Sequence, residues 1–282
     1  YDRFLTTVES ITPDDIKPGA LLDVMEGPAG LIIALRHHRD THSRELCHRL
    51  GLLLTNAASE GWGSKRVCAM TRNASFAHDA GGMGTAVLIA AEMGSNPDMV
   101  DSWRAAWEFE NTFKLEEGWN DTRSPGNNHS TQWCHGLAGI ALARAVWLQT
   151  IEDSAFLRSV VTPDEIARIR AELEEAAGLL VRDLDTSGSP SLCHGVAGGA
   201  LVLDLATRQL GRRDWRDAAD DLVARAGAAL SRCPWLWGKH DVRDFGIMTG
   251  PGGLILAHNI LQLPDGGVGP LLPDLGHIGG AA

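Results

Sequence analysis

The sequence has little positive charge and no long apolar run, and both shortages exclude classes of protein. Its 25 Lys and Arg are outnumbered by 36 Asp and Glu, which gives a net charge of −11. Binding to nucleic-acid phosphates needs clustered basic residues, so no nucleic-acid partner is expected. A transmembrane helix needs a continuous apolar stretch of about 18 residues or more, and none occurs. We therefore expect a globular protein with no membrane span.

Cysteine is scarce, and regular β-strand patterns are missing. The five cysteines are odd in number, and no hydrophobic secretion signal precedes them. Free thiols or metal ligands therefore fit better than a disulfide framework, and we expect a cytoplasmic protein. Runs of β-branched residues with an alternating pattern are absent. This absence disfavours sheets and leaves a helical fold as the expectation.

A short glycine motif recurs along the chain at nearly regular spacing. The sequence Gly-x-x-Gly, once in a degenerate form, starts at residues 27, 79, 136, 195 and 250. Repeats of this length are typical of stacked or circular arrays. Almost wholly apolar segments follow the motif, and a helix that is apolar on all sides is buried. Each motif is thus predicted to start a buried helix; these segments include residues 31–35, 86–91, 140–147 and 200–205.

Amphipathic segments lie between the apolar ones. Residues 162–165 read Thr-Pro-Asp-Glu, a capping box with proline at the first helical position. Apolar residues then recur at helical spacing, and residues 42–54, 102–113 and 215–230 show a similar pattern. Each repeat is therefore predicted to pair a buried inner helix with an amphipathic outer helix. We expect an all-α fold with two concentric layers, in which the glycine ends of five inner helices face a common axis.

Two copies of the motif follow a cysteine and a histidine, which makes them candidates for metal binding. The chain reads Cys134-His135-Gly136 at one copy and Cys193-His194-Gly195 at the other. Thiolate and imidazole are ligands that zinc prefers, so the two pairs offer four donors. Four protein ligands would make a structural zinc site, whereas three would leave a position open for catalysis. The residues alone leave both interpretations open.

The two residues before each motif show which side chains share a place in the repeat. If equivalent positions of a circular array face one central space, two thiols and three imidazoles converge there. His78 follows an alanine rather than a cysteine, which favours proton transfer over metal binding at that position. The pairs, in chain order, are Met25-Glu26, Ala77-His78, Cys134-His135, Cys193-His194 and Met248-Thr249.

The motifs, taken in order, resemble the LanC-like lanthipeptide cyclases. The nearest resemblance is to the cyclase domain at the C-terminal end of class II lanthionine synthetases. Any single stretch is a weak signal, but the ordered set covers nearly the whole chain and is specific. The matching stretches are residues 23–27, 76–78, 119–123, 133–136, 192–195 and 246–250.

The resemblance implies an α,α-toroid with Zn²⁺ at its centre. It implies that Cys134, Cys193 and His194 hold the zinc, that His135 does not, and that Asp23 and His78 are acid–base groups. It further implies a cyclase that adds peptide cysteine thiols to dehydroalanine or dehydrobutyrine and so forms thioether rings. The partner would be a dehydrated precursor peptide, together with a dehydratase domain or a separate dehydratase.

The chain departs from the family pattern at two points. Asp79 stands where the family has glycine, and this carboxylate beside His78 is expected to raise the histidine pKa or crowd the pocket. The family toroid has seven helix pairs, whereas five inner helices are predicted here. We therefore expect residues 1–282 to form one LanC-like domain that lacks two N-terminal helix pairs and any dehydratase domain.

Two other functions remain open from the residues. The first is a non-catalytic peptide-binding toroid with a structural Cys2His2 zinc. The second is a zinc hydrolase, although the chain has no His-Glu-x-x-His motif. The occupant of the fourth zinc position distinguishes them, because His135 in that position would indicate a structural site.

Overall fold

Helices make up all the regular structure that is described. The computed structural model describes residues 21–63, 74, 76–123, 126, 128–184, 189–232 and 245–263. Within these residues there is no strand, and the one β-bridge, between Lys114 and Trp119, is isolated. None of the helices there combines the length and the apolar character needed to cross a bilayer. The all-α prediction is confirmed for this part of the chain.

Each of the five glycine motifs is followed by one inner helix, which begins one or two residues after the motif starts, as predicted. Their burial follows from their composition: every residue of α6 from Leu137 to Leu148 is buried, and α4 is buried along nearly its whole length. These inner helices are α2 (Pro28–Leu35), α4 (Ala80–Gly94), α6 (Leu137–Asp153), α9 (Val196–Leu210) and α11 (Gly252–Leu261).

Four amphipathic helices are buried along one face only and form the outer layer. The predicted capping box begins the third of them: the Thr162 side chain accepts a hydrogen bond from the Glu165 N–H, and the Glu165 carboxylate accepts one from the Thr162 N–H. Two short helices, η2 (Ala58–Glu60) and α7 (Ala155–Val160), complete the described structure. The outer helices are α3 (Thr41–Ala57), α5 (Pro97–Asn111), α8 (Pro163–Asp183) and α10 (Arg213–Arg232).

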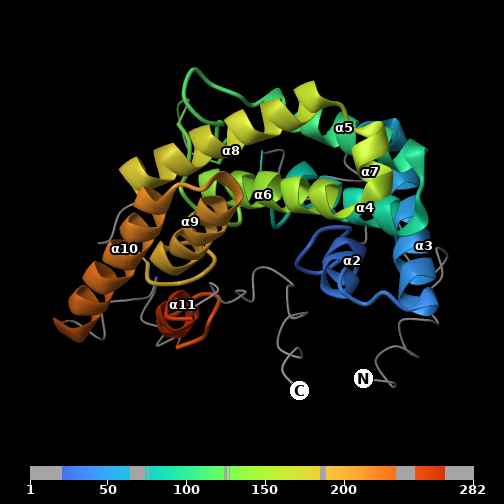
Figure 1. Cartoon of the computed structure of the whole chain (residues 1–282). Helices are drawn as coiled ribbons and strands as arrows, with labels where there is room; N and C mark the ends of the chain where they lie inside the picture. Colours follow the sequence, from blue (N-terminus) through green and yellow to red (C-terminus); the bar gives the residue numbers. More distant parts are fainter. Residues whose placement is uncertain are drawn as a thin grey trace.

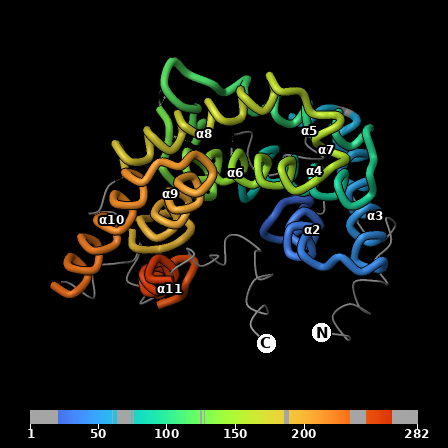
Figure 2. Tube along the Cα trace, viewed as in Figure 1, coloured from blue at the N-terminus to red at the C-terminus, as the bar shows by residue number. Residues whose placement is uncertain are grey.

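The described helices form a two-layered arc (Figures 1 and 2). Successive inner helices pack on each other in the order α2, α4, α6, α9 and α11. Outer helices α5, α8 and α10 pack on α4, α6 and α9, respectively. Helices α2 and α11 lie at the two ends of the arc (Figure 1). Within the described residues the inner helices thus form an open arc rather than a closed ring.

The last glycine of each motif allows the new helix to pack tightly on the loop that leads into it. A Cβ atom at Gly198 would lie 2.0 Å from the carbonyl oxygen of Leu192, six residues earlier. Any side chain there would displace the loop, which explains the glycine. The same contact recurs in the other repeats, at Gly30 with Val24, Gly82 with Phe76, Gly139 with Trp133, and Gly253 with Ile247.

A buried ion-pair network joins the two layers. Arg144 of α6 lies 2.5 Å from a Glu110 oxygen of α5 and 2.8 Å from a Glu172 oxygen of α8. Its guanidinium also lies over the rings of Trp147 and Trp119, 4.3 and 5.8 Å from their centroids. Charges this deeply buried must be paired, so the network fixes how these three helices meet.

Candidate active site

Backbone hydrogen bonds bind the loops before the inner helices into one continuous chain. Val24 N–H donates to the Ala77 carbonyl (3.1 Å), Ala77 N–H to that of Cys134 (3.4 Å), Cys134 N–H to that of Cys193 (3.4 Å), and Cys193 N–H to that of Met248 (2.9 Å). Ala77, Cys134, Cys193 and Met248 are equivalent residues of four repeats. We call this chain of bonds the loop ladder. It confirms that the equivalent positions gather in one place.

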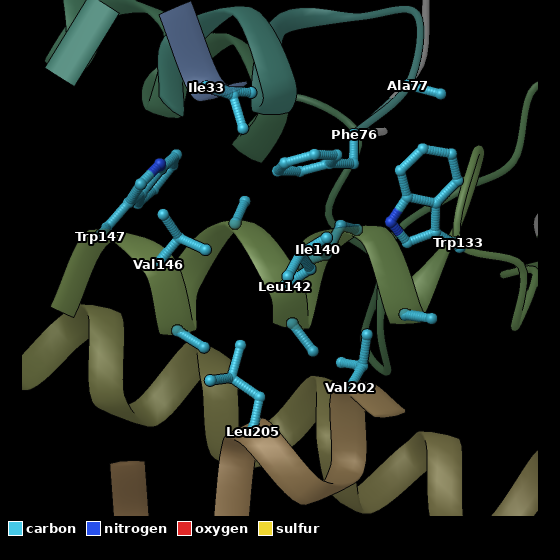
Figure 3. Close-up of a cluster of buried hydrophobic side chains, with 14 of the residues drawn as sticks. Ile33, Phe76, Ala77, Trp133, Ile140, Leu142, Val146, Trp147, Val202 and Leu205 are labelled. Carbon is cyan, nitrogen blue, oxygen red and sulfur yellow. The ribbon is translucent and has the colours of Figure 1, made fainter. Parts of the chain in front are cut away.

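Aromatic side chains anchor two of these loops in the core. Phe76 and Trp133 lie beside each other near Ile140 of α6 (Figure 3), with ring centroids 5.8 Å apart. Phe76 precedes Ala77 and His78 by one and two residues, and Trp133 directly precedes Cys134. Both rings are buried. The loop segments that carry the polar side chains after these rings are therefore anchored by packed apolar contacts.

Three donor atoms converge at the centre of the ladder. The Sγ atoms of Cys134 and Cys193 and an imidazole nitrogen of His194 all lie within 4.8 Å of one another. Cys193 Sγ lies 3.7 Å from His194 Nε2. A tetrahedral zinc site with ordinary Zn–S and Zn–N bonds places two such atoms about 3.5 Å apart. The cysteines are buried or half-buried, whereas His194 is exposed. The donor set thus fits a zinc ion with one side open to a bound molecule.

Hydrogen bonding shifts the pKa values of the two thiols of this cluster in opposite directions. A hydrogen bond with Cys134 lowers the pKa of Cys193, while the same interaction and burial raise that of Cys134. Cys47 in α3 shows the contrast, because burial, as the largest cause, raises its pKa to about 12. Cys193 is therefore the thiol that most readily loses its proton to become a ligand.

His78 forms a close pair with Asp23. Its Nδ1 lies 2.8 Å from Asp23 Oδ2, while Asp23 Oδ1 accepts hydrogen bonds from the N–H groups of Met25 (3.0 Å) and Glu26 (2.8 Å). The Asp23 bond raises the pKa of His78. Burial opposes ionisation of Asp23, but its hydrogen bonds outweigh burial and lower its pKa. Because Nδ1 is engaged, Nε2 is the ring nitrogen left for proton transfer.

His135 lies outside the thiol cluster, among the residues that the structure describes. Its ring stacks on that of His78 with centroids 5.2 Å apart, and its Nδ1 lies 3.8 Å from Asp79 Oδ2. Burial, together with the positive charges of Arg123 and His78, lowers the pKa of His135 to about 4. His135 is thus a neutral neighbour of His78 at physiological pH.

The Asp79 carboxylate acts on His78 less directly than its sequence position suggests. Asp79 is fully buried and faces His135, whereas His78 takes Asp23 as its hydrogen-bond partner. The expected rise in the pKa of His78 is present, but Asp23 is its main cause and Asp79 a lesser one. Adjacent residues in extended backbone point to opposite sides, which explains why Asp79 turns away from its neighbour.

Comparison with known proteins decides the family. A sequence model described as "Lanthionine synthetase C-like protein" matches residues 1–265 of the chain. The chain belongs to this family. The lacticin 481/lactococcin biosynthesis protein LcnDR2 of Lactococcus lactis subsp. lactis is 26% identical over 251 residues, which are 88% of this chain and 25% of that protein. The chain therefore spans about a quarter of the length of this curated relative.

A solved structure supports the fold of this lanthionine synthetase C-like protein. Nisin cyclase superposes with a TM-score of 0.64 at 20% identity, over 91% of this chain and 67% of the nisin cyclase chain. The likeness shows that the two-layered helical arc is the α,α-toroid of the family. It agrees with the toroid expected from the repeats and the resemblance.

A fourth polar group beside the thiols has no role assigned by sequence. Arg123 and Asp121 form a two-bonded ion pair (Nε–Oδ1 2.8 Å, Nη2–Oδ2 2.6 Å). Both residues lie in the stretch 119–123 of this lanthionine synthetase C-like chain. That stretch carries part of the family resemblance, but the sequence gave no chemical role for either side chain. The signal for the pair was the Asp-x-Arg spacing in a polar loop that leads toward Cys134.

Proposed function

We propose that the chain catalyses thioether ring formation in a dehydrated peptide. A peptide cysteine thiol adds to dehydroalanine or dehydrobutyrine and yields a lanthionine or methyllanthionine. One arrangement carries the proposal: a cluster of two thiols and an imidazole beside a His–Asp pair. The Cys134 thiol contributes to the raised pKa of His78, so the two parts lie within electrostatic reach of each other. Membership of the lanthionine synthetase C-like family supports the same reaction.

Cys134, Cys193 and His194 would hold a zinc ion in this site. Zinc with these three protein ligands would supply a fourth position at which the substrate thiol loses its proton and remains a nucleophile. A free cysteine thiol has a pKa of about 8.5, so it is mostly protonated at neutral pH without such help. The remaining chemistry falls to side chains of the chain itself.

His78 would deliver the proton that completes the addition. When sulfur attacks the β-carbon, negative charge develops on the neighbouring amide, and the α-carbon must then be protonated. The hydrogen bond that His78 donates to Asp23 keeps His78 protonated to higher pH than an isolated imidazole. Asp23 also fixes the ring, since its other oxygen is held by the backbone of residues 25 and 26. His78 is thus both charged and oriented for proton donation.

The position of His135 favours this function over a structural Cys2His2 zinc. Its ring packs on His78, and its Nδ1 faces Asp79 rather than the thiols. Three protein donors with an exposed member fit an open, catalytic site better than a closed one. A hydrolase would need the same cluster to activate water, and two thiolate ligands weaken the metal as a Lewis acid for that purpose.

The partners and setting follow from the reaction. The substrate would be a dehydrated precursor peptide, made by a dehydratase that is either a further domain or a separate protein. Cys47, Cys134 and Cys193 are free thiols in the described part of the chain. A reaction that consumes free thiols suits a reducing compartment, so we propose that it takes place in the cytoplasm.

The direct test uses a synthetic peptide with one cysteine and one dehydroalanine. The zinc-loaded chain is expected to close the ring, which removes the thiol from reaction with N-ethylmaleimide without changing the peptide mass. The Cys193→Ala variant serves as the inactive control. Cleaved peptide would indicate a hydrolase, and tight peptide binding with no ring would indicate a binding module; either result would contradict the proposal.

A further inference from the structure

Arg123 is held at one edge and open at the other. Asp121 accepts hydrogen bonds from its Nε and Nη2 atoms, at 2.8 and 2.6 Å. Across the described residues, Nη1 has no hydrogen-bond acceptor, and about a third of the side chain is exposed. Asp121 itself is buried; burial opposes its ionisation, but the bonds from Arg123 outweigh burial and lower its pKa. The pair thus presents two fixed N–H donors to solvent.

The Arg123 guanidinium lies beside the thiol cluster. Arg123 Nη2 donates to Gln132 Oε1 at 3.2 Å, and the same oxygen lies 3.7 Å from Cys134 Sγ. One side chain therefore separates the guanidinium from the Cys134 thiol. Its positive charge is felt by the groups around it, since it contributes to the lowered pKa values of both Cys193 and His135.

The loop that carries Arg123 is rigidly supported. Trp119 is buried, its Nε1–H donates to Asn111 Oδ1 at 3.1 Å, and Lys114 Nζ lies 3.6 Å over its ring. Backbone bonds from Asn120 N to Phe113 O and from Asp121 N to Asn128 O fix the loop on both sides. A donor held in advance stabilises developing charge without reorganisation. The structure therefore holds Arg123 in place before any ligand arrives.

We propose that Arg123 is a catalytic residue that binds the amide oxygen of the dehydrated residue through Nη1. This proposal rests on the proposed function, because it assigns a role within the same reaction. The guanidinium would stabilise the charge that appears on this oxygen as sulfur adds. Arginine suits this task because it stays charged at every physiological pH and presents its donors in a fixed plane.

The step balances without any further reactant. The thiolate sulfur forms a bond to the β-carbon, and the electron pair of the carbon–carbon double bond shifts so that charge develops on the amide oxygen. That oxygen is the atom Arg123 contacts. The proton from His78 then joins the α-carbon and restores the carbonyl. The proton that the thiol gave up to solvent is offset by the one that His78 supplies and later regains from solvent, so the peptide keeps its composition. No oxidant or reductant takes part.

The chain offers a matched control for this arginine. Arg212 forms the same two-bonded pair with Asp214, also two residues away, at 3.0 and 2.9 Å. It lies directly before outer helix α10 and takes no part in the site. Arg123→Gln and Arg212→Gln therefore remove the same kind of ion pair inside and outside the site. Both variants are compared with the unaltered chain in zinc content, thermal unfolding, and kcat and KM for the dehydroalanine peptide.

Removal of one donor to a developing oxyanion lowers kcat by roughly 10²–10³-fold in other enzymes. We expect a loss of this size in Arg123→Gln with unchanged zinc, and no loss in Arg212→Gln. A rise in KM alone, or rates equal to those of the control, would overturn the proposal. So would loss of zinc or of thermal stability in both Arg123→Gln and Arg123→Lys, because Arg123 would then hold the loop. If the unaltered chain forms no ring at all, the proposed function fails instead.

Discussion

The two Cys-His-Gly motifs are almost the same in sequence, yet their histidines lie in different surroundings. His194 is exposed, and its Nε2 lies 3.7 Å from the adjacent Cys193 thiol. His135 is buried and turns away from Cys134 to stack on His78. The difference arises from the preceding repeat, which supplies His78 and Asp79 to His135. The repeat sets where a side chain is placed, and the neighbouring repeat sets what it contacts.

The largest expected effect is a loss of zinc and activity on substitution of a cysteine of the cluster, compared with a cysteine buried elsewhere in the core. Cys193→Ala should lose zinc and ring formation together, because two donors remain where the proposal needs three. Cys47→Ala is the control, since Cys47 is fully buried in α3. Zinc is measured by atomic emission and ring formation by thiol alkylation. Full zinc in Cys193→Ala would remove this motif from the metal site.

The next effect concerns the imidazole that has no cysteine before it. His78→Asn should retain zinc and fold while it slows ring closure by roughly 10²–10⁴-fold, the usual contribution of a general acid. Zinc content and single-turnover rates are measured on the same sample. A normal rate would remove His78 from the mechanism, whereas loss of zinc would make it a ligand.

The Asp23 partner gives a change in pH dependence rather than a large loss. His78 donates a proton only while charged, so the rate should fall as pH rises through its pKa. Asp23 raises that pKa. Asp23→Asn should therefore move the falling limb of the pH–rate profile to lower pH, with zinc unchanged. A limb that stays in place would show that another group carries the proton.

The smallest effect is expected at the second histidine of the comparison. His135→Phe preserves an aromatic face against His78, so zinc content and ring formation should remain close to normal. His135→Asn removes the stacking, which is worth about 0.5–1.5 kcal/mol, and should slow the reaction by roughly 2- to 12-fold. If either substitution abolished zinc binding, His135 would be a fourth ligand and the site would be structural.

The sequence predicts the helices and their ends well because these depend on local chemistry. Glycine motifs mark where the inner helices begin, and the capping box begins α8 as expected. Repeat positions also predict that the thiols and imidazoles before the motifs gather, while the choice of Cys134, Cys193 and His194 among them came from the family resemblance. Such features need only periodicity and steric rules, both of which can be read from short stretches of sequence.

Contacts between distant helices were beyond that kind of prediction. Arg144 contacts Glu110 and Glu172 because of the way in which three helices pack against one another. No local sequence pattern encodes that packing. The Asp23–His78 bond joins residues 55 apart, whereas the resemblance implied that both are acid–base groups but not that they bond to each other. Asp79 was expected to act on His78 directly, yet it faces His135, because side-chain direction depends on backbone geometry at the helix start.

The loop ladder has a consequence for how such a site can change. Its hydrogen bonds use only main-chain N–H and C=O groups, those of Val24, Ala77, Cys134, Cys193 and Met248. The bonds that assemble the centre therefore do not involve their side chains, which are alanine, cysteine or methionine at the equivalent positions. Substitution at these positions can alter reactivity without dismantling the framework that displays it.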